Sequence, residues 1–131
     1  MIEVVFQRDK YRWCSFQSKG HSGYKDSGED IVCAAISAIL QTALLGTQAF
    51  DRELSNYIIE DGFLEWNLAV NSENKVDLQI QSIITAATLG CLNIAVQYPE
   101  FISVKVTGVL GWKNRKKYKL QDLNQLIELL K

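Results

Sequence analysis

Residues 27–46 read SGEDIVCAAISAILQTALLG, and this stretch decides the fold. Ser27 to Asp30 matches the S/T-x-x-D/E pattern of helix starts, in which side-chain oxygens accept hydrogen bonds from the first backbone N–H groups. The residues that follow are apolar on most faces of a helix, as far as about Leu45, and Gly46 is a typical stop. A helix of this kind is mostly buried. We therefore predict a buried helix that ends at about Leu45.

Two β-hairpins flank this helix in the sequence. Before it, residues 2–7 alternate between apolar and polar, which predicts a strand, and residues 11–18 predict its partner. After it, residues 54–59 and 63–70 lie on either side of Asp61-Gly62. Asp-Gly between two β-prone runs is a strong hairpin signal, because the turn requires positive φ angles.

The rest of the chain adds two helices and a strand. Residues 73–97 predict a long helix, residues 101–106 a strand, and residues 120–130 a C-terminal amphipathic helix. The fold class is therefore α+β: an antiparallel-rich mixed sheet built from two hairpins plus a further strand, with two main helices packed on it. The core face of the long helix is predicted to hold Val76, Ile80, Ile83, Ile84, Ala87, Cys91, Ile94 and Ala95.

Length and composition favour one soluble domain. The chain has 131 residues, 47% of them hydrophobic and 22% charged, which is ordinary for a globular protein. We see no secretory signal, and the apolar stretch 31–45 is shorter than the ~20 residues of a membrane span. The three cysteines form no CxxC pair and the chain has one histidine. We expect a cytoplasmic protein with free thiols, no metal, no cofactor and no membrane contact.

Charge divides the chain in two. Residues 1–108 hold 8 Lys/Arg and 13 Asp/Glu, a net charge of −5, whereas residues 109–131 hold 6 and 2, a net charge of +4. We take 1–108 as the main domain and 109–131 as a basic tail and C-terminal helix of unknown role. A basic segment can contact phosphate, but it can equally be solvated surface. Because the main domain is acidic, we expect no direct nucleic-acid partner.

Cys33 is the residue most indicative of chemistry. At helical spacing Asp30, Cys33, Ser37 and Gln41 fall on one line and form a polar stripe. A thiol near a helix N-terminus is easily deprotonated, and the only histidine, His21, lies twelve residues earlier. Together they supply a nucleophile and a base.

Other interpretations of these residues, without a proteolytic role, remain open at this point. His21 could be a surface histidine and Cys33 a half-buried thiol, or Cys33 could be a redox sensor, although no resolving cysteine is nearby in sequence. Asp30 could begin the helix or orient His21, and Ser37 could bond its own helix backbone. Cys14 and Cys91 are expected to be small core residues.

Two motifs resemble a known family. They are Gly20-His21-Ser22-Gly23-Tyr24 and Gly28-Glu-Asp-Ile-Val-Cys33-Ala-Ala-Ile-Ser37-Ala. The pattern GHxGY, a short loop and GEDIVCAAxSA is similar to that of the ribosomal-processing cysteine proteases (Prp). The similarity extends in order over about residues 1–106, and the tail from about Gly108 departs from it.

The resemblance implies a cysteine endopeptidase with a dyad of Cys33 and His21. It implies removal of the N-terminal extension of a large-subunit ribosomal protein, by cleavage after an aromatic residue, and it implies a homodimer. Asp30 and Ser37 would have supporting roles. The loop from Gly20 to Gly28, with Ser22 and Gly23, would act as a lid and is a candidate source of oxyanion N–H donors, as is the start of the helix.

The alternative is a non-catalytic ribosome-assembly or rRNA-contacting protein that uses the basic segment of the tail. For the homodimer the sequence offers a second apolar stripe on the long helix, which could instead meet the C-terminal helix. That stripe consists of Leu78, Leu89, Leu92 and Val96.

Overall fold

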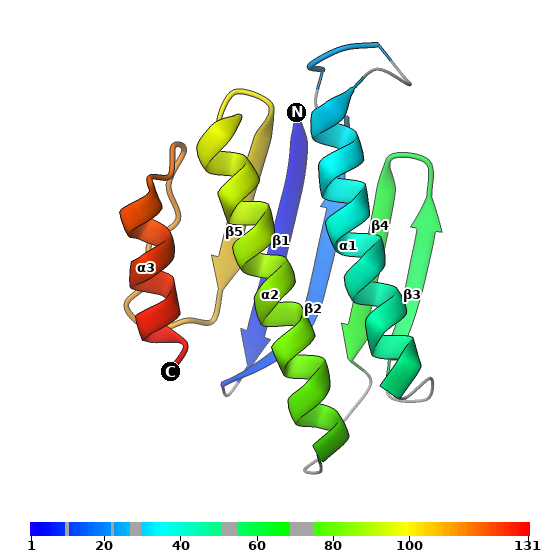
Figure 1. Ribbon diagram of the computed structural model, residues 1–131, viewed down its shortest axis with the longest axis vertical. Coiled ribbons are helices and arrows are strands. Elements are labelled where there is room, and N and C mark those ends of the chain that lie inside the picture. The colour runs from blue at the N-terminus through cyan, green and yellow to red at the C-terminus, as the bar shows by residue number, and fades with distance from the viewer. Residues whose placement is uncertain (10, 22, 27–29, 51–54, 69–74) are drawn as a thin grey trace.

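A computed structural model describes residues 1–9, 11–21, 23–26, 30–50, 55–68 and 75–131. Figure 1 shows two layers, a five-stranded sheet with the helices on one of its faces. The predicted α+β class is confirmed. The elements, in chain order, are β1 (Ile2–Asp9), β2 (Arg12–Lys19), α1 (Ile31–Phe50), β3 (Ser55–Glu60), β4 (Phe63–Leu68), α2 (Lys75–Gln97), β5 (Ile102–Thr107) and α3 (Leu120–Leu129).

The sheet is mixed, as predicted. Its strand order is β3-β4-β2-β1-β5, and only the pairing of β1 with β5 is parallel. A parallel pair needs a crossover connection, which α2 supplies here. The helix-facing side of the sheet holds a cluster of aromatic rings: Phe16 stacks on Trp66 at 5.4 Å and meets Phe6 in a tilted arrangement at 5.7 Å, centroid to centroid. These rings are fully buried and form the centre of the core.

Helix α1 starts and ends later than predicted. It begins at Ile31, with Asp30 as the residue before its first turn, and it continues past Gly46 to Phe50. Ser27, the predicted helix start, lies outside the described residues. A Cβ on Gly46 would lie 3.3 Å from Ile83 Cδ1 of α2. Gly46 therefore lies inside the helix, where the absence of a side chain lets α1 and α2 pack closely.

Helices α1 and α2 are each long and apolar enough to cross a membrane by length and composition alone. The sequence analysis judged the stretch 31–45 too short to span a membrane, but α1 continues to Phe50 and has 20 residues. Both helices pack against the sheet (Figure 1), and core helices of ordinary domains meet the same criterion. Their length and composition are therefore weak evidence for a membrane span.

The second apolar stripe of α2 is not a continuous exposed surface. Leu92 is fully buried, Leu89 and Val96 pack against the core, and Leu78 is exposed. Helix α3 lies beside α2 in Figure 1, and its Leu126 is also fully buried. Residues after 108 therefore share the core of the rest of the chain.

Candidate active site

Asp30 fixes the start of α1 and with it the position of Cys33. Its carboxylate Oδ1 accepts hydrogen bonds from the backbone N–H groups of Val32 (3.0 Å) and Cys33 (2.9 Å). Its carbonyl accepts the N–H of Ala34 at 3.1 Å. This is the bonding of an N-cap residue, which satisfies N–H groups that the helix itself leaves unpaired. Cys33 therefore projects from a well-anchored first turn.

His21 is held at the end of β2 by two glycines. The N–H of Gly20 donates to the carbonyl of Gly62, in the β3–β4 turn, at 2.9 Å. Gly62 has φ +71°, and a Cβ there would lie 3.0 Å from His21 Nε2. Gly20 has φ +92°, and a Cβ there would lie 2.6 Å from the carbonyl oxygen of Met1. The backbone contact at Gly20 requires glycine, the positive φ at Gly62 favours it, and Gly62 forms one wall against the imidazole.

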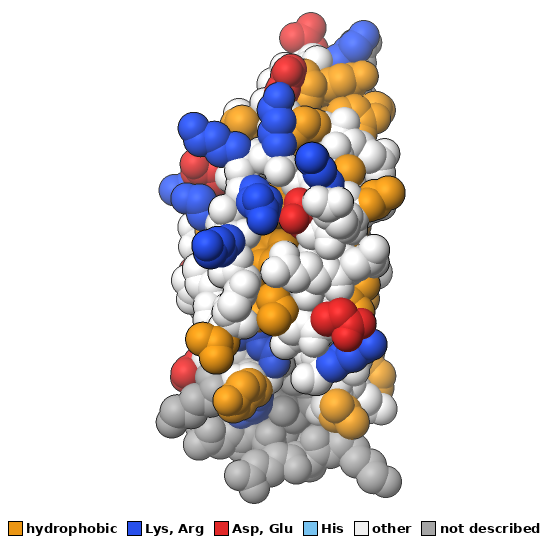
Figure 2. All heavy atoms as spheres, turned by 90° about the vertical axis from the view of Figure 1, so that its left-hand side faces the viewer, with side chains coloured by type: hydrophobic (Ala, Val, Ile, Leu, Met, Phe, Trp, Pro, Cys, Tyr) orange, Lys and Arg blue, Asp and Glu red, His pale blue; other side chains and the backbone are white. Residues whose placement is uncertain are grey.

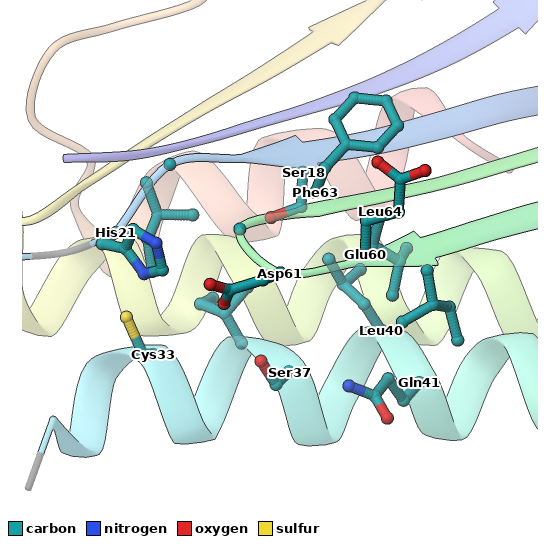
Figure 3. A pocket seen from close by; sticks show the side chains of 15 residues that line it. Ser18, His21, Cys33, Ser37, Leu40, Gln41, Glu60, Asp61, Phe63 and Leu64 are labelled. Atoms are coloured by element: carbon teal, nitrogen blue, oxygen red, sulfur yellow. The ribbon is translucent and has the colours of Figure 1, made fainter. Parts of the chain in front are cut away.

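His21 and Cys33 line the same cavity, between α1 and the β3–β4 turn. Figure 3 shows the Cys33 sulfur pointing from α1 toward the His21 ring. The cavity has a volume of about 310 Å³, within the usual range for ligand pockets. Cys33 is half-buried and His21 is exposed. The thiol and the imidazole can therefore both be reached by a ligand in this cavity.

A second hollow adjoins the first on the side of Asp30. Four residues line both spaces: His21, Cys33, Ser37 and Asp61. The second hollow is completed by Gly23, Lys25, Asp30 and Ala34. The thiol and imidazole thus lie between two hollows. This arrangement suits an extended ligand that passes across Cys33 with residues on both sides of it.

The predicted polar stripe lies along these hollows. Ser37 and Gln41 are exposed on α1, and both line the cavity that contains Cys33. Figure 3 shows two further carboxylates there, those of Glu60 and Asp61. The sequence analysis treated Asp61 only as a turn residue and did not single out Glu60. The sequence marks Asp61 only as part of an Asp-Gly turn, and nothing in that signal places the turn beside His21.

The predicted lid is only partly described. Ser22 and Gly28 lie outside the described residues. Gly23 has φ +72°, with no atom within 4 Å of where a Cβ would stand. Tyr24 packs edge-on against Phe101 and Tyr98, at centroid distances of 5.1 Å and 5.7 Å. The loop is therefore anchored at Tyr24, a role the sequence analysis missed.

The other two thiols differ from Cys33. Cys91 is fully buried, as predicted, and this burial raises the pKa of its thiol. Cys14 was expected in the core, but it is only half-buried, at an irregularity in the β1–β2 pairing, and its thiol donates to the carbonyl of Gln7 at 3.4 Å. Among the described residues, no three His, Cys, Asp or Glu side chains gather in a way that would hold a metal ion.

A half-buried thiol at a helix start that shares an open cleft with an imidazole is compatible with nucleophilic catalysis by the thiol. The model of the family described as "Cysteine protease Prp" matches residues 1–103 of this chain, and the chain belongs to that family. No curated protein matches the chain in sequence.

Solved structures share this fold. The ribosomal processing protease Prp from S. aureus, in complex with a covalently linked product peptide, is similar with a TM-score of 0.72 and 23% identity, over 82% of this chain and 100% of that one. The same protease with a substrate peptide has a TM-score of 0.67 and 20% identity, with the same coverage. SMU.848 from Streptococcus mutans has a TM-score of 0.69 and 30% identity, over 81% and 93%.

Proposed function

We propose that this chain is a cysteine endopeptidase that removes the N-terminal extension of a large-subunit ribosomal protein by cleaving after an aromatic residue. The observation that carries the proposal is the placement of His21 and Cys33 on one cavity, with the sulfur directed toward the ring (Figure 3). Membership of the protease family supports the reaction class. The structure of a similar S. aureus protease with a product peptide supports a peptide ligand.

The mechanism uses a thiolate and an acid–base histidine. His21 removes the proton from Cys33, and the sulfur attacks the carbonyl carbon of the scissile peptide bond. When the tetrahedral intermediate collapses, the C–N bond breaks and His21 returns the proton to the leaving amine. Water, deprotonated by His21, then attacks the thioester, and the acid product leaves as the thiol forms again.

Several backbone N–H groups near Cys33 already donate hydrogen bonds within the protein, which reduces the number of candidates for the oxyanion hole. The N–H groups of residues 32, 33 and 34 donate to Asp30, and that of Gly20 donates to Gly62. Gly23 lines the hollow beside Cys33, so its N–H is our strongest candidate in the described part of the loop. One such donor typically contributes about 10²–10³ in rate.

The aromatic side chain of the substrate would bind on the apolar side of the cavity. Ile36, Leu40 and Leu64 are buried at its base, and the half-exposed Ile59 of β3 forms part of its rim. A cavity of about 310 Å³ with an apolar base is large enough for a phenyl ring. Substitution of Leu40 by Trp would fill this space and should favour substrates with a small side chain at the cleavage site.

The direct test is incubation of the purified protein with the precursor form of the ribosomal protein, followed by N-terminal mapping of the product. Cys33→Ala and His21→Ala should each abolish cleavage after the aromatic residue. Cys14→Ala is the matched control, because it removes a half-buried thiol elsewhere and should cleave normally. Cleavage by Cys33→Ala, or loss of cleavage in Cys14→Ala, would refute the assignment.

We also propose that the enzyme acts as a homodimer in the cytoplasm, where thiols stay reduced. In support of a dimer, a shallow apolar groove lies between α1 and α2, lined by small residues that include Ala38, Thr42, Gly46, Ala86 and Gly90. Light scattering should give a dimeric mass for the unmodified chain and a monomeric mass for Thr42→Arg. A monomeric mass for the unmodified chain would exclude the dimer.

A further inference from the structure

A basic segment follows β5 and lies outside the part of the chain that matches the family model. Residues 113–119 read KNRKKYK, so five of seven are Lys or Arg, and all five side chains are exposed. Figure 2 shows the face formed by α3 and the segment before it, where Lys and Arg side chains gather over the upper half. We call residues 113–119 the basic segment.

The backbone of the basic segment is fixed against the outer edge of β5. Asn114 bonds the backbone of Val106 twice: its Oδ1 accepts the N–H at 2.8 Å, and its Nδ2 donates to the carbonyl at 3.1 Å. The Tyr118 hydroxyl donates to the carbonyl of Val104 at 2.6 Å. A side-chain amide thus replaces a neighbouring strand at this sheet edge. The segment is an ordered part of the fold.

Aromatic packing adds to this order. The rings of Trp112 and Tyr118 are stacked at 5.8 Å with an interplanar angle of 12°. Burial of Tyr118 raises the pKa of its hydroxyl, and the negative charge of Asp122 adds to this effect. Arg115 partly offsets the rise through a backbone hydrogen bond and its positive charge. Because Asn114 and Tyr118 bond the sheet edge, the exposed cations lie on the solvent side of the segment.

In the part of the chain that the structure describes, most of these side chains form no salt bridge. Arg115 pairs with the buried carboxylate of Asp122 at 3.2 Å. Within the described residues, Lys113, Lys116, Lys117 and Lys119 have no carboxylate within 4.0 Å of their ammonium groups. Four like charges held close together on an ordered segment repel one another, and an anionic ligand would relieve that repulsion.

We propose that the basic segment is a docking surface for the phosphate backbone of RNA. A cluster of exposed lysines on an ordered segment offers several contacts to a polyanion, and phosphate contacts from Lys and Arg supply sequence-independent affinity. The alternative of an anionic membrane is less favoured, because Leu123 and Leu126 of α3 pack against the core, so that only part of the apolar surface of this helix, Leu120, Ile127 and Leu129, is exposed. The choice of RNA rests on the proposed ribosomal substrate. It departs from the expectation of no nucleic-acid partner, which considered only net charge.

The test is fluorescence anisotropy with fluorescein-labelled oligouridine and the full chain, titrated at several KCl concentrations. Four phosphate contacts on a single strand predict a slope of log affinity against log salt of about −3, so that a fourfold rise in salt weakens binding about 60-fold. Lys116→Gln/Lys117→Gln should bind at least about tenfold more weakly at low salt and halve the slope. Neither lysine lines the cavity of Cys33, so cleavage of a short peptide should not change.

The matched control is Lys19→Gln/Lys131→Gln. It removes the same charge from exposed lysines that are paired with Glu3 and Glu128, at 3.6 Å and 3.0 Å. Unchanged RNA binding in this control supports a specific surface. An equal loss in both double variants, no salt-dependent binding by the unmodified chain, or tighter binding to anionic phosphatidylserine vesicles than to RNA would each overturn the inference. Peptide cleavage, measured alongside, reports separately on the proposed protease function.

Discussion

Gly62→Ala is the substitution whose effect on the proposed site follows most directly from the geometry. The new Cβ would lie 3.0 Å from His21 Nε2, which is tighter than an ordinary contact, so the imidazole must shift by a few tenths of an ångström. A 1 Å misplacement of a catalytic group can cost about 10²-fold in rate. We therefore expect kcat/KM for peptide cleavage to fall by about 3- to 10-fold.

The same substitution also strains the backbone. Gly62 has φ +71°, and an L-residue in this region costs about 1–2 kcal/mol. For a chain of this size such a cost lowers Tm by about 3–8 °C. Gly111→Ala is the matched control, since φ is +88° and its Cβ would meet only the Leu129 side chain at 3.3 Å. It should lose similar stability and keep full activity.

Two assays separate these effects. Thermal melts give the stability of both variants, and steady-state cleavage well below either Tm gives kcat/KM. The alkylation rate of Cys33 by iodoacetamide, read by mass spectrometry, gives an independent measure of how well His21 activates the thiol. Our reasoning fails if Gly62→Ala keeps wild-type kcat/KM and alkylation rate, or if Gly111→Ala loses as much activity.

Three further predictions concern stability and thiol reactivity. Asp30→Ala should lower the free energy of unfolding in urea by about 1 kcal/mol, because α1 loses its N-cap. Asp30→Asn keeps a capping side chain and should unfold near wild type. Equal losses in the two variants would contradict the capping role. Asn114→Ala should cost about 1–3 kcal/mol in urea unfolding, because backbone groups of β5 lose their partner, and it should leave peptide cleavage intact. A wild-type unfolding curve would argue against this. Cys91 should resist iodoacetamide until the protein is denatured. Burial raises the pKa of its thiol, so the folded state holds that proton more tightly than the unfolded state. The free energy of unfolding should therefore fall as the pH rises above the usual thiol pKa of 9.0. Rapid labelling of native Cys91, or stability that does not change there, would show that the thiol is accessible.

Local patterns in the sequence predicted most of the fold. Alternation in β1, the Asp-Gly turn and the helical period of α2 each depend on neighbouring residues, so their type could be inferred from the sequence alone. Gly46 was misjudged because its role depends on Ile83, which is distant in sequence. A glycine at a helix end and a glycine at a helix crossing look alike without the partner helix.

The site shows the same division. Helix position and residue type made Cys33 and His21 candidates, and the resemblance to the Prp family implied that they form a dyad. The structure brings both to one cavity. Asp61 and Gly62 could not be assigned to that cavity from sequence, because only the β2–β4 pairing brings their turn beside His21. The order of the basic segment was likewise invisible, since it depends on Asn114 reaching the edge of β5.

The account depends most on the identity of the attacking sulfur. The most direct measurement is mass spectrometry of the protein after reaction with a peptidyl chloromethyl ketone that carries phenylalanine at the reactive end. We predict one adduct per chain, located on Cys33, formed much more slowly in His21→Ala. An adduct on Cys14, or equal rates with and without the imidazole, would contradict the account.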